Sequence, residues 1–306
     1  QTCALPISIF DIDGDDEPEI LVSNSLSSNI IYKFNDATGT FVDVAPKNFK
    51  AKDKATLCMC VGDFTGTGVA SVYMLHSDTV AGLKSHYDSL FLKSSTPQVD
   101  LAFTDLFLDF PQMSNPYAGR SVVAVDRLGT GKHGFYVVNY DAPNLFYELN
   151  EKTMCIEELG KKLNVDQKTF GRSVVAQYIT NDKAVDFFVG NEHSANSFLT
   201  KSSKNSYSEI SSDLNLSDKD FNSRGLAVAD FDGNGFTDIV LGTWNGLNSI
   251  FMQKTPGEFT NLPPAFFGEP RNIRSIIVAD FDNDGNEEIF VNVYKKRNKM
   301  FRYLGH

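Results

Sequence analysis

The stretch 224–248 reads RGLAVADFDGNGFTDIVLGTWNGLN and contains a compact acidic loop between two apolar runs. Counted from Asp230, oxygen-bearing side chains stand at loop positions 1, 3, 5 and 9, and a glycine stands at position 6. A short segment with this spacing can surround a hard cation, which prefers six to eight oxygen ligands. The pattern therefore predicts a calcium-binding loop.

The same acidic loop occurs at two further places, beginning at Asp11 and at Asp280. We call position 1 of each loop its anchor, and we expect position 7 to offer its backbone carbonyl. The predicted calcium ligands are Asp11, Asp13, Asp15, Glu17 and Glu19; Asp230, Asp232, Asn234, Phe236 and Asp238; and Asp280, Asp282, Asp284, Asn286 and Glu288.

Apolar, β-branched runs flank the acidic loops. Residues 226–229 and 276–279 precede two of them, and residues 239–241 and 289–291 follow. Such runs predict strands, so each loop should join two strands of a β-hairpin. The last ligand also comes too early for the twelve-residue loop between two helices. We therefore expect calcium to bind in β-hairpins.

Weaker copies of the loop start at Asp63, Asp126 and Tyr178, which gives six anchors at intervals of 50 to 63 residues. Within a repeat, the two strands of the hairpin are followed by two more apolar segments. Four antiparallel strands per repeat of this length are typical of a β-propeller blade, because each blade buries its faces against its neighbours. The longest interval places an insertion at Ser77 to Asp88 of repeat 2.

The quoted stretch resembles the FG-GAP or VCBS repeat of integrin-α-type propellers, and within that family the cartilage acidic protein 1 group. The resemblance implies an all-β fold, a β-propeller of four-stranded blades that is usually seven-bladed, with calcium in the hairpin loops and an extracellular or cell-surface setting. We expect the six repeats of residues 8–306 to form one propeller domain within a seven-bladed ring. A closed six-bladed ring is the alternative.

The two ends of the chain do not fit the repeat. Residues 1–7 lack its pattern and match the peptide expected from a sequencing adapter read in frame, so we interpret them as a non-native leader. At the other end, the sequence stops after the third predicted strand of repeat 6. We interpret the chain as a fragment of a longer protein.

The acidic loops can be ranked by their ligands, with two or three calcium ions expected in all. Loop 6 has four carboxylates and Gly285, so it should bind most strongly. Loop 5 has three carboxylates, and loop 1 places Asp16 where a positive φ is expected. Loops 2 and 3 have too few carboxylates and should close by hydrogen bonds instead. For loop 4, which has Asp182 and Asp186, the sequence does not decide between calcium binding and closure by hydrogen bonds.

Arginine recurs six residues before four anchors, at Arg120, Arg172, Arg224 and Arg274. In a propeller this position lies at the end of the central channel opposite the hairpins. The four guanidinium groups could bind a carboxylate or sulfate, or they could form salt bridges between blades. The single tryptophan, Trp244, could likewise contact a sugar or a protein partner, or pack between blades.

Charge and motifs exclude several classes of function. The net charge is -11 and no basic stripe is present, which argues against nucleic-acid binding. No apolar run approaches the eighteen residues of a membrane span. Since nucleophile and phosphate-binding motifs are absent, we predict no enzyme activity. Lyase or hydrolase chemistry is the alternative, with His193 beside Glu192 as the residue to test.

Two functions remain. The first is a calcium-binding extracellular, secreted or cell-surface propeller that binds a protein or a matrix component, as in adhesion. The second is a carbohydrate-binding or carbohydrate-active propeller that uses the arginines. The loops that would select a partner follow no repeat, so the sequence does not identify the partner.

Overall fold

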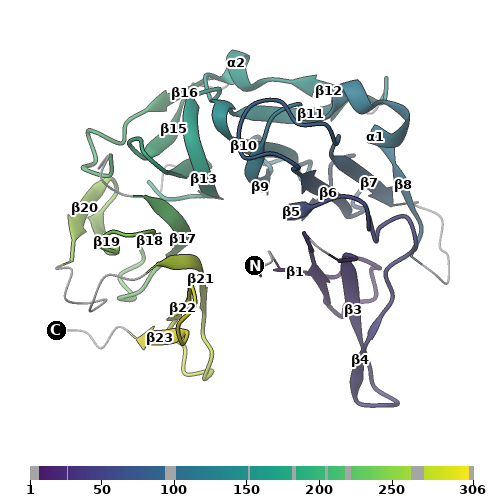
Figure 1. Cartoon of the computed structure of the whole chain (residues 1–306). Coiled ribbons are helices and arrows are strands. Elements are labelled where there is room, and N and C mark those ends of the chain that lie inside the picture. The colour runs from purple at the N-terminus through teal and green to yellow at the C-terminus, as the bar shows by residue number, and fades with distance from the viewer. Residues whose placement is uncertain are drawn as a thin grey trace. The chain divides into compact units, whose positions relative to one another are not determined.

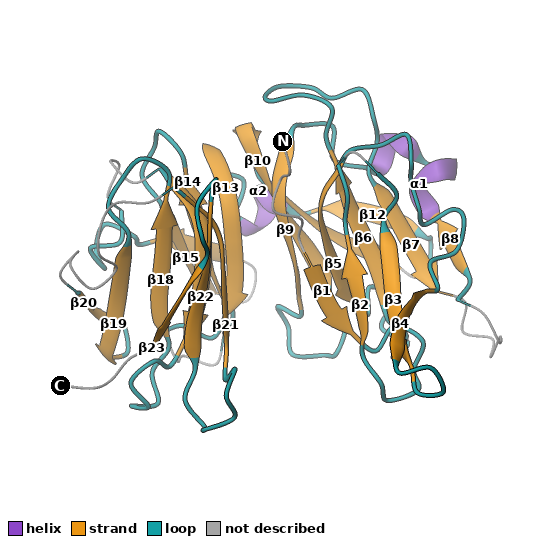
Figure 2. Cartoon of the chain, turned by 60° about the horizontal axis from the view of Figure 1, so that its bottom comes forward, coloured by secondary structure: helices purple, strands orange, loops and turns teal. Residues whose placement is uncertain are grey.

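The computed structural model describes residues 7–25, 27–93, 101–150, 152–180, 184–203, 206–217, 222–262 and 272–302. Figure 2 shows that strands make up most of the regular structure, with a few short helical segments. The chain divides into two compact units, which we describe separately. Unit 1 contains residues 1–161 and 166–168, and unit 2 contains residues 162–165 and 169–306.

Unit 1 contains repeats 1 to 3, and each repeat contributes four consecutive antiparallel strands (Figure 1). Two short helical segments, α1 (Leu106–Asp109) and η1 (Pro111–Met113), follow repeat 2. The strands are β1 (Ile7–Phe10), β2 (Glu19–Val22), β3 (Ile30–Asn35), β4 (Thr40–Asp43), β5 (Thr56–Gly62), β6 (Ser71–His76), β7 (Ser89–Lys93), β8 (Phe103–Asp105), β9 (Gly119–Val125), β10 (Gly134–Pro143), β11 (Leu145–Asn150) and β12 (Cys155–Glu158).

Unit 2 contains repeats 4 to 6. Helix α2 (Gly160–Leu163) precedes its first strand, and repeat 6 has three strands in the described part of the chain. The strands are β13 (Lys168–Gln177), β14 (Asp186–Asn191), β15 (Ser197–Ser203), β16 (Ser206–Glu209), β17 (Ser223–Ala229), β18 (Asp238–Thr243), β19 (Ser249–Thr255), β20 (Glu258–Asn261), β21 (Ile273–Ala279), β22 (Glu288–Val293) and β23 (Lys299–Arg302).

The hairpin prediction is confirmed, because all six anchors lie in the connection between the first and second strands of a repeat. In repeat 5, for example, Ala229 pairs with Asp238 across the loop. Ile7, which we assigned to the leader, is the first residue of β1 and pairs with Val22. The non-native origin of the leader stays a prediction. Residues 1–6 lie outside the described residues.

The core of each unit lies between neighbouring repeats. In unit 1, Phe135 of β10 stacks on Tyr73 of β6, with 4.3 Å between ring centroids, and both side chains are fully buried. In unit 2, Ile273 and Ile276 of β21 pack with Val240 of β18. The second strand of each repeat is therefore covered by apolar side chains of an adjacent repeat, as blades of a propeller require. The number of blades in the complete ring stays a prediction.

The predicted insertion, residues 77–88, connects β6 to β7 and lies against the start of repeat 3. Leu83 forms a β-bridge with Tyr117, and the Ala118 N–H donates to the Gly82 carbonyl at 2.9 Å. At its base, Lys84 forms a buried ion pair with Asp88. The insertion is therefore held by backbone pairing and by a buried charge pair.

In the described residues, none of the helices is long and apolar enough to cross a lipid bilayer.

Gly242 of β18 shows how closely two repeats of unit 2 approach each other. A Cβ atom at this position would lie 2.4 Å from Cγ2 of Ile273. We expect Gly242→Ala to lower the free energy of unfolding by about 1–3 kcal/mol, because the added methyl group forces β18 and β21 apart. Urea unfolding measures the change. The cost should shrink in an Ile273→Ala background, and an equal cost in both backgrounds would contradict the contact.

Candidate metal sites

In the five loops whose anchor is an aspartate, the anchor closes the loop by accepting backbone hydrogen bonds. Asp230 accepts from the N–H groups of Asn234 and Gly235, at 3.0 and 2.7 Å. Position 6 has a positive φ in five loops, including Gly235 at 88° and Asp16 at 69°. The positive φ expected for Asp16 is confirmed. Since Asp63 and Asp126 accept the same position-6 hydrogen bond, the anchor closes loops with and without an acidic cluster.

The acidic residue at position 9 is buried and uses one oxygen to fix the loop. In each acidic loop it accepts from the backbone N–H at position 2. Glu19 accepts from Ile12 at 2.9 Å, Asp238 from Phe231 at 2.9 Å, and Glu288 from Phe281 at 3.0 Å. Their exposed fractions are 0%, 0% and 3%. The second oxygen contacts the third strand of the repeat. That of Asp238 accepts from the Gln253 N–H at 2.6 Å, that of Glu288 accepts from Arg302, and that of Glu19 lies 3.4 Å from the Lys33 ammonium nitrogen.

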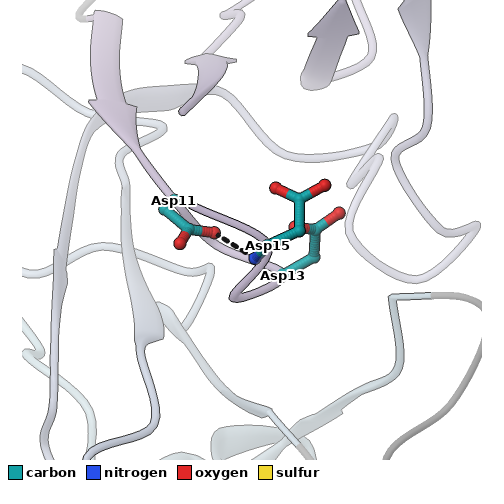
Figure 3. A group of neighbouring side chains, drawn as sticks. All are labelled: Asp11, Asp13 and Asp15. Atoms are coloured by element: carbon teal, nitrogen blue, oxygen red, sulfur yellow. Dashed lines mark hydrogen bonds between the residues drawn. The ribbon is translucent and has the colours of Figure 1, made fainter. Parts of the chain in front are cut away.

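Three carboxylate clusters result, one in each acidic loop. In each cluster, one oxygen from every member lies within 4.8 Å of the others. Figure 3 shows Asp11, Asp13 and Asp15 on one hairpin, with the Asp15 N–H donating to the Asp11 carboxylate. The clusters are Asp11, Asp13 and Asp15; Asp230, Asp232 and Asp238; and Asp280, Asp282 and Glu288.

Of the predicted ligands, Glu19, Asn234 and Asp284 lie in these loops but not in the clusters. The side chains of Asn234 and Asp284 contact both the loop and the third strand of the repeat. The Asn234 amide donates to the Asp232 carboxylate at 3.2 Å and to the Gln253 carbonyl at 2.9 Å. Asp284 accepts from the N–H of Asn286 at 2.9 Å. Glu17 and Phe236 occupy position 7 of loops 1 and 5, as predicted. Calcium coordination by any of these residues stays a prediction.

Loop 2 closes by hydrogen bonds, as predicted for the loops with few carboxylates. The Asp63 carboxylate accepts from the Thr65 hydroxyl at 3.0 Å, and the hydroxyls of Thr65 and Thr67 lie 2.7 Å apart. Burial opposes ionisation of Asp63, but hydrogen bonds from Gly68 and Thr65 hold the pKa of its carboxyl below the usual value. In loop 4, Asp186 accepts from the Thr180 N–H at 2.8 Å, and Asp182 lies outside the described residues.

Within the described residues, loop 5 holds its three carboxylates without a cationic partner. No lysine or arginine of the described residues forms an ion pair with Asp230, Asp232 or Asp238. Burial, together with the charges of Asp232 and Asp230, raises the pKa of Asp238 to about 6. The mutual repulsion and the donor set of hard oxygens fit a divalent cation such as calcium. These residues would hold the ion, which would neutralise the loop.

Loop 1 contains a lysine ammonium group. Lys33 of β3 forms ion pairs with Asp13 and Asp15, and its Nζ lies 3.4 Å from the Glu19 Oε1 atom. Burial opposes the charge of Lys33, but the hydrogen bonds to Asp13 and Asp15 raise its pKa above the usual value. The carboxylates of loop 1 therefore already face a positive charge.

In loop 6, an arginine guanidinium group contacts the carboxylates, as the lysine ammonium group does in loop 1. Arg302 of β23 donates through Nε to Glu288 at 2.8 Å, and its Nη2 lies 2.5 Å from Asp282 and 2.8 Å from Asp284. Three of the four carboxylates that made this loop the strongest predicted site thus contact one guanidinium. As arranged here, loops 1 and 6 do not fit a divalent cation as well as loop 5 does.

Two of the predicted arginines share one carboxylate in unit 2. Glu192 pairs with Arg172 and, at 2.5 Å, with Arg224. Burial opposes ionisation of Glu192, but both guanidinium groups hold the pKa of its carboxyl below the usual value. This arrangement corresponds to the second of the two interpretations, salt bridges between repeats.

The Trp244 ring lies between Arg224 and Arg274. Its ring is 4.9 Å from the Arg224 guanidinium carbon and 4.8 Å from that of Arg274, and Arg274 also lies 4.6 Å from the Tyr294 ring. The half-buried Trp244 thus separates two like charges by cation–π contacts. In unit 1, Arg120 donates to the Thr79 carbonyl at 3.2 Å and lies 5.6 Å from the Tyr140 ring.

Sequence reasoning missed the position that organises these arginines. Glu192, Trp244 and Tyr294 each lie 14 residues after an anchor, directly beyond the second strand of their repeats. Tyr140 has the same position in repeat 3. An acidic or aromatic residue recurring at this offset is a signal that the sequence does contain. A role of the arginines in binding an anion stays a prediction.

Replacing Glu192 tests the shared ion pair. We expect Glu192→Gln to lower the free energy of unfolding by about 2–4 kcal/mol, because Arg172 and Arg224 then face each other without a carboxylate. Denaturant unfolding measures the loss. Glu258→Gln, which removes an exposed carboxylate of β20, is the matched control. A loss as small as that of the control would show that the pair contributes little.

The residues proposed for an alternative enzymatic role do not form an acid–base pair in the described structure. The Glu192 carboxylate pairs with two arginines, and the backbone N–H of His193 donates to the Asn222 side-chain oxygen at 3.2 Å. The His193 ring packs edge-on against Phe170, with 6.3 Å between centroids.

Comparison with known families matches the repeats directly. The sequence profile of the FG-GAP-like repeat matches residues 11–74, 179–241 and 230–291, which together span more than half of the chain. The chain belongs to the FG-GAP-like repeat family. The three matches contain acidic loops 1, 5 and 6. The first also contains loop 2, and the second contains loop 4 except for its anchor, Tyr178.

Among curated proteins, this FG-GAP-like chain is similar to cartilage acidic protein 1. The identity is 30% with the protein of Xenopus tropicalis and 26% with that of Mus musculus, in both cases over 88% of this chain and 45% of the relative. The chain therefore spans about half the length of the curated relatives it matches.

Two solved structures share the fold. BBS1N, crystallised in complex with ARL6DN, is 10% identical and gives a TM-score of 0.56 over 97% of this chain and 78% of its own. The Dos1 propeller is 12% identical and gives a TM-score of 0.54 over 97% of this chain and 65% of its own. The FG-GAP-like repeats thus form a β-propeller fold.

Proposed function

We propose that this FG-GAP-like propeller is a calcium-stabilised interaction module that works outside the cell and binds a protein or matrix component. The observation that carries the calcium part is loop 5. It holds three carboxylates within 4.8 Å of one another, and its glycines at positions 4 and 6 adopt φ values of 70° and 88°. An ion bound there stabilises the fold, because the unfolded chain has no such cluster.

Two observations support the extracellular and interaction parts. The curated relatives are named for cartilage, a tissue rich in extracellular matrix, and match over most of this chain. The insertion at 77–88 displays Val80 and Leu83, which are 67% and 73% exposed, on a segment fixed by backbone pairing. Rigidly held exposed loops are typical of binding surfaces on a repeat scaffold.

Calorimetric titration tests the calcium part. We expect calcium chloride added to the metal-stripped chain to give saturable binding, and we expect Asp232→Asn to remove it. Asp213→Asn changes the same charge at an exposed position of unit 2 and should leave binding intact. Binding that survives Asp232→Asn would place the ion elsewhere, and no binding by the wild-type chain would remove the calcium proposal.

Solid-phase binding tests the interaction part. The chain is applied to purified matrix proteins and glycosaminoglycans, in calcium and in a calcium chelator. We expect saturable binding to one class of component, lost on chelation. The double variant Val80→Ser and Leu83→Ser should weaken protein binding without changing the melting temperature. Absence of binding to every component in calcium would contradict an interaction role in the matrix.

Carbohydrate binding is the second candidate, and one observation favours it. Arg274 lies between the Trp244 and Tyr294 rings, and no residue of the described chain forms an ion pair with its guanidinium. A cation flanked by aromatic rings can hold an acidic sugar. An array of sulfated and carboxylated glycans tests this, with Arg274→Ala expected to lose binding and Lys254→Ala to keep it. If the chain binds no glycan on the array, carbohydrate binding is ruled out as the function.

A further inference from the structure

The three acidic loops differ in their surroundings, and this difference has a consequence for metal binding. We propose that Lys33 and Arg302 are built-in counter-cations that take the place of calcium in loops 1 and 6, so that the chain binds calcium at loop 5 alone. The inference rests on the proposed calcium binding. It also reverses the ranking expected from the number of carboxylates.

In loop 1, the ammonium group contacts two of the three carboxylates of the acidic cluster. Lys33 contacts Asp13 and Asp15 and lies 3.4 Å from Glu19 Oε1, an atom that has no hydrogen-bond donor in the described structure. A second ammonium group, of Lys93, donates to the carbonyls of Ile12 and Asp13, at 2.8 and 2.7 Å. Loop 1 therefore faces two positive charges.

In loop 6, the guanidinium group bridges the two ends of the loop. It contacts Asp282 and Asp284 through Nη2 and Glu288 through Nε. Arginine matches this task well, because its planar fork presents several N–H donors at fixed angles. A calcium ion would need the same oxygens, so it must first displace the side chain.

The two cations occupy the same position of the repeat. Lys33 and Arg302 each lie 22 residues after their anchors, Asp11 and Asp280, on the third strand. The residue at this position of repeat 5 is Met252, which is 6% exposed and packs in the apolar core of unit 2. One position of the repeat therefore separates loops with a cation from the loop without one.

A calcium ion and the Lys33 or Arg302 side-chain cation cannot occupy the same loop together, because their positive charges repel each other. A divalent cation within a few ångströms of an ammonium or guanidinium group is strongly repelled in a partly buried site. To bind, it must also replace ion pairs that already neutralise part of the cluster. In loop 5 the ion meets only carboxylates and an amide, so no side-chain cation has to move.

Counting bound calcium tests the inference. The metal-stripped wild-type chain, Lys33→Met, Arg302→Met and Lys254→Met are titrated with calcium chloride, and the number of bound ions is read from calorimetry and from native mass spectrometry. Methionine is the residue that repeat 5 has at this position. We expect one ion for the wild type, two for Lys33→Met, two for Arg302→Met, and one for Lys254→Met, which removes an exposed charge from β19.

The outcomes separate this inference from the proposed function. Three ions bound by the wild type, or no gain in either methionine variant, would overturn the inference while leaving calcium binding in place. No ion in the wild type but one in each methionine variant would support the counter-cations and overturn binding at loop 5. Far-ultraviolet circular dichroism of each variant shows whether it is folded, and Lys33→Gln and Arg302→Gln replace any variant that is not.

Discussion

Lys84→Met is expected to lower the free energy of unfolding by about 3–5 kcal/mol, the largest loss we predict for a single charge. The Lys84 side chain is 1% exposed and that of Asp88 is 0% exposed, and the two form a buried ion pair. Asp88 also accepts hydrogen bonds from the Tyr73 hydroxyl and, at 2.8 Å, from the His76 N–H. Without Lys84, the Asp88 carboxylate stays in the core of repeat 2 and loses its ion-pair partner.

Urea unfolding compares Lys84→Met with Lys50→Met. Lys50 pairs with Asp43 on the surface, where the side chains are 31% and 34% exposed, so its loss should cost less than about 1 kcal/mol. A double variant, Lys84→Met with Asp88→Leu, should recover part of the stability, because it removes both buried charges. If Lys84→Met costs no more than Lys50→Met, the buried pair does not hold the insertion in place.

Calcium is expected to raise the stability of the metal-stripped chain by about 2.7 kcal/mol at a concentration one hundred times the dissociation constant. The stabilisation arises at loop 5, where Asp230, Asp232 and Asp238 repel one another. An ion removes this repulsion in the folded state and has no comparable site in the unfolded chain. Thermal unfolding in calcium and in chelator measures the effect, with magnesium as the control ion.

Asp232→Asn should remove the calcium-dependent stabilisation and make the metal-free protein slightly more stable, since one repelling charge is gone. The reverse pattern, in which the variant keeps the full calcium shift, would contradict binding at loop 5. An unchanged melting temperature of the wild-type chain in calcium and in chelator would mean that the loop is only a tight turn.

The hairpins and the loop geometry could be predicted from the sequence because both are local. The spacing of Asp230, Asn234 and Gly235 fixes a turn in which the anchor accepts two nearby N–H groups. The apolar runs on either side pair directly across it. The hydrogen bonds within loop 2 followed from the same local frame, since Thr65 and Thr67 have hydroxyls where loop 5 has an acid and an amide.

The neighbours of the loops could not be predicted, because they come from distant strands. Lys33 reaches loop 1 from β3, and the count of carboxylates alone gave no sign of it. The same holds for Arg302, which contacts the loop that we ranked first. The partner of Arg172 and Arg224 was also missed, since Glu192 was considered only as a neighbour of His193.

The most direct test of the account is a crystal structure of the chain grown in calcium, with anomalous diffraction to locate the ion. The account predicts one anomalous peak, with Asp230, Asp232 and Asp238 oxygens about 2.3–2.6 Å away, and with Lys33 and Arg302 still bound to loops 1 and 6. A map with no peak at loop 5, or with peaks at loops 1 and 6 and both side chains turned away, would contradict it.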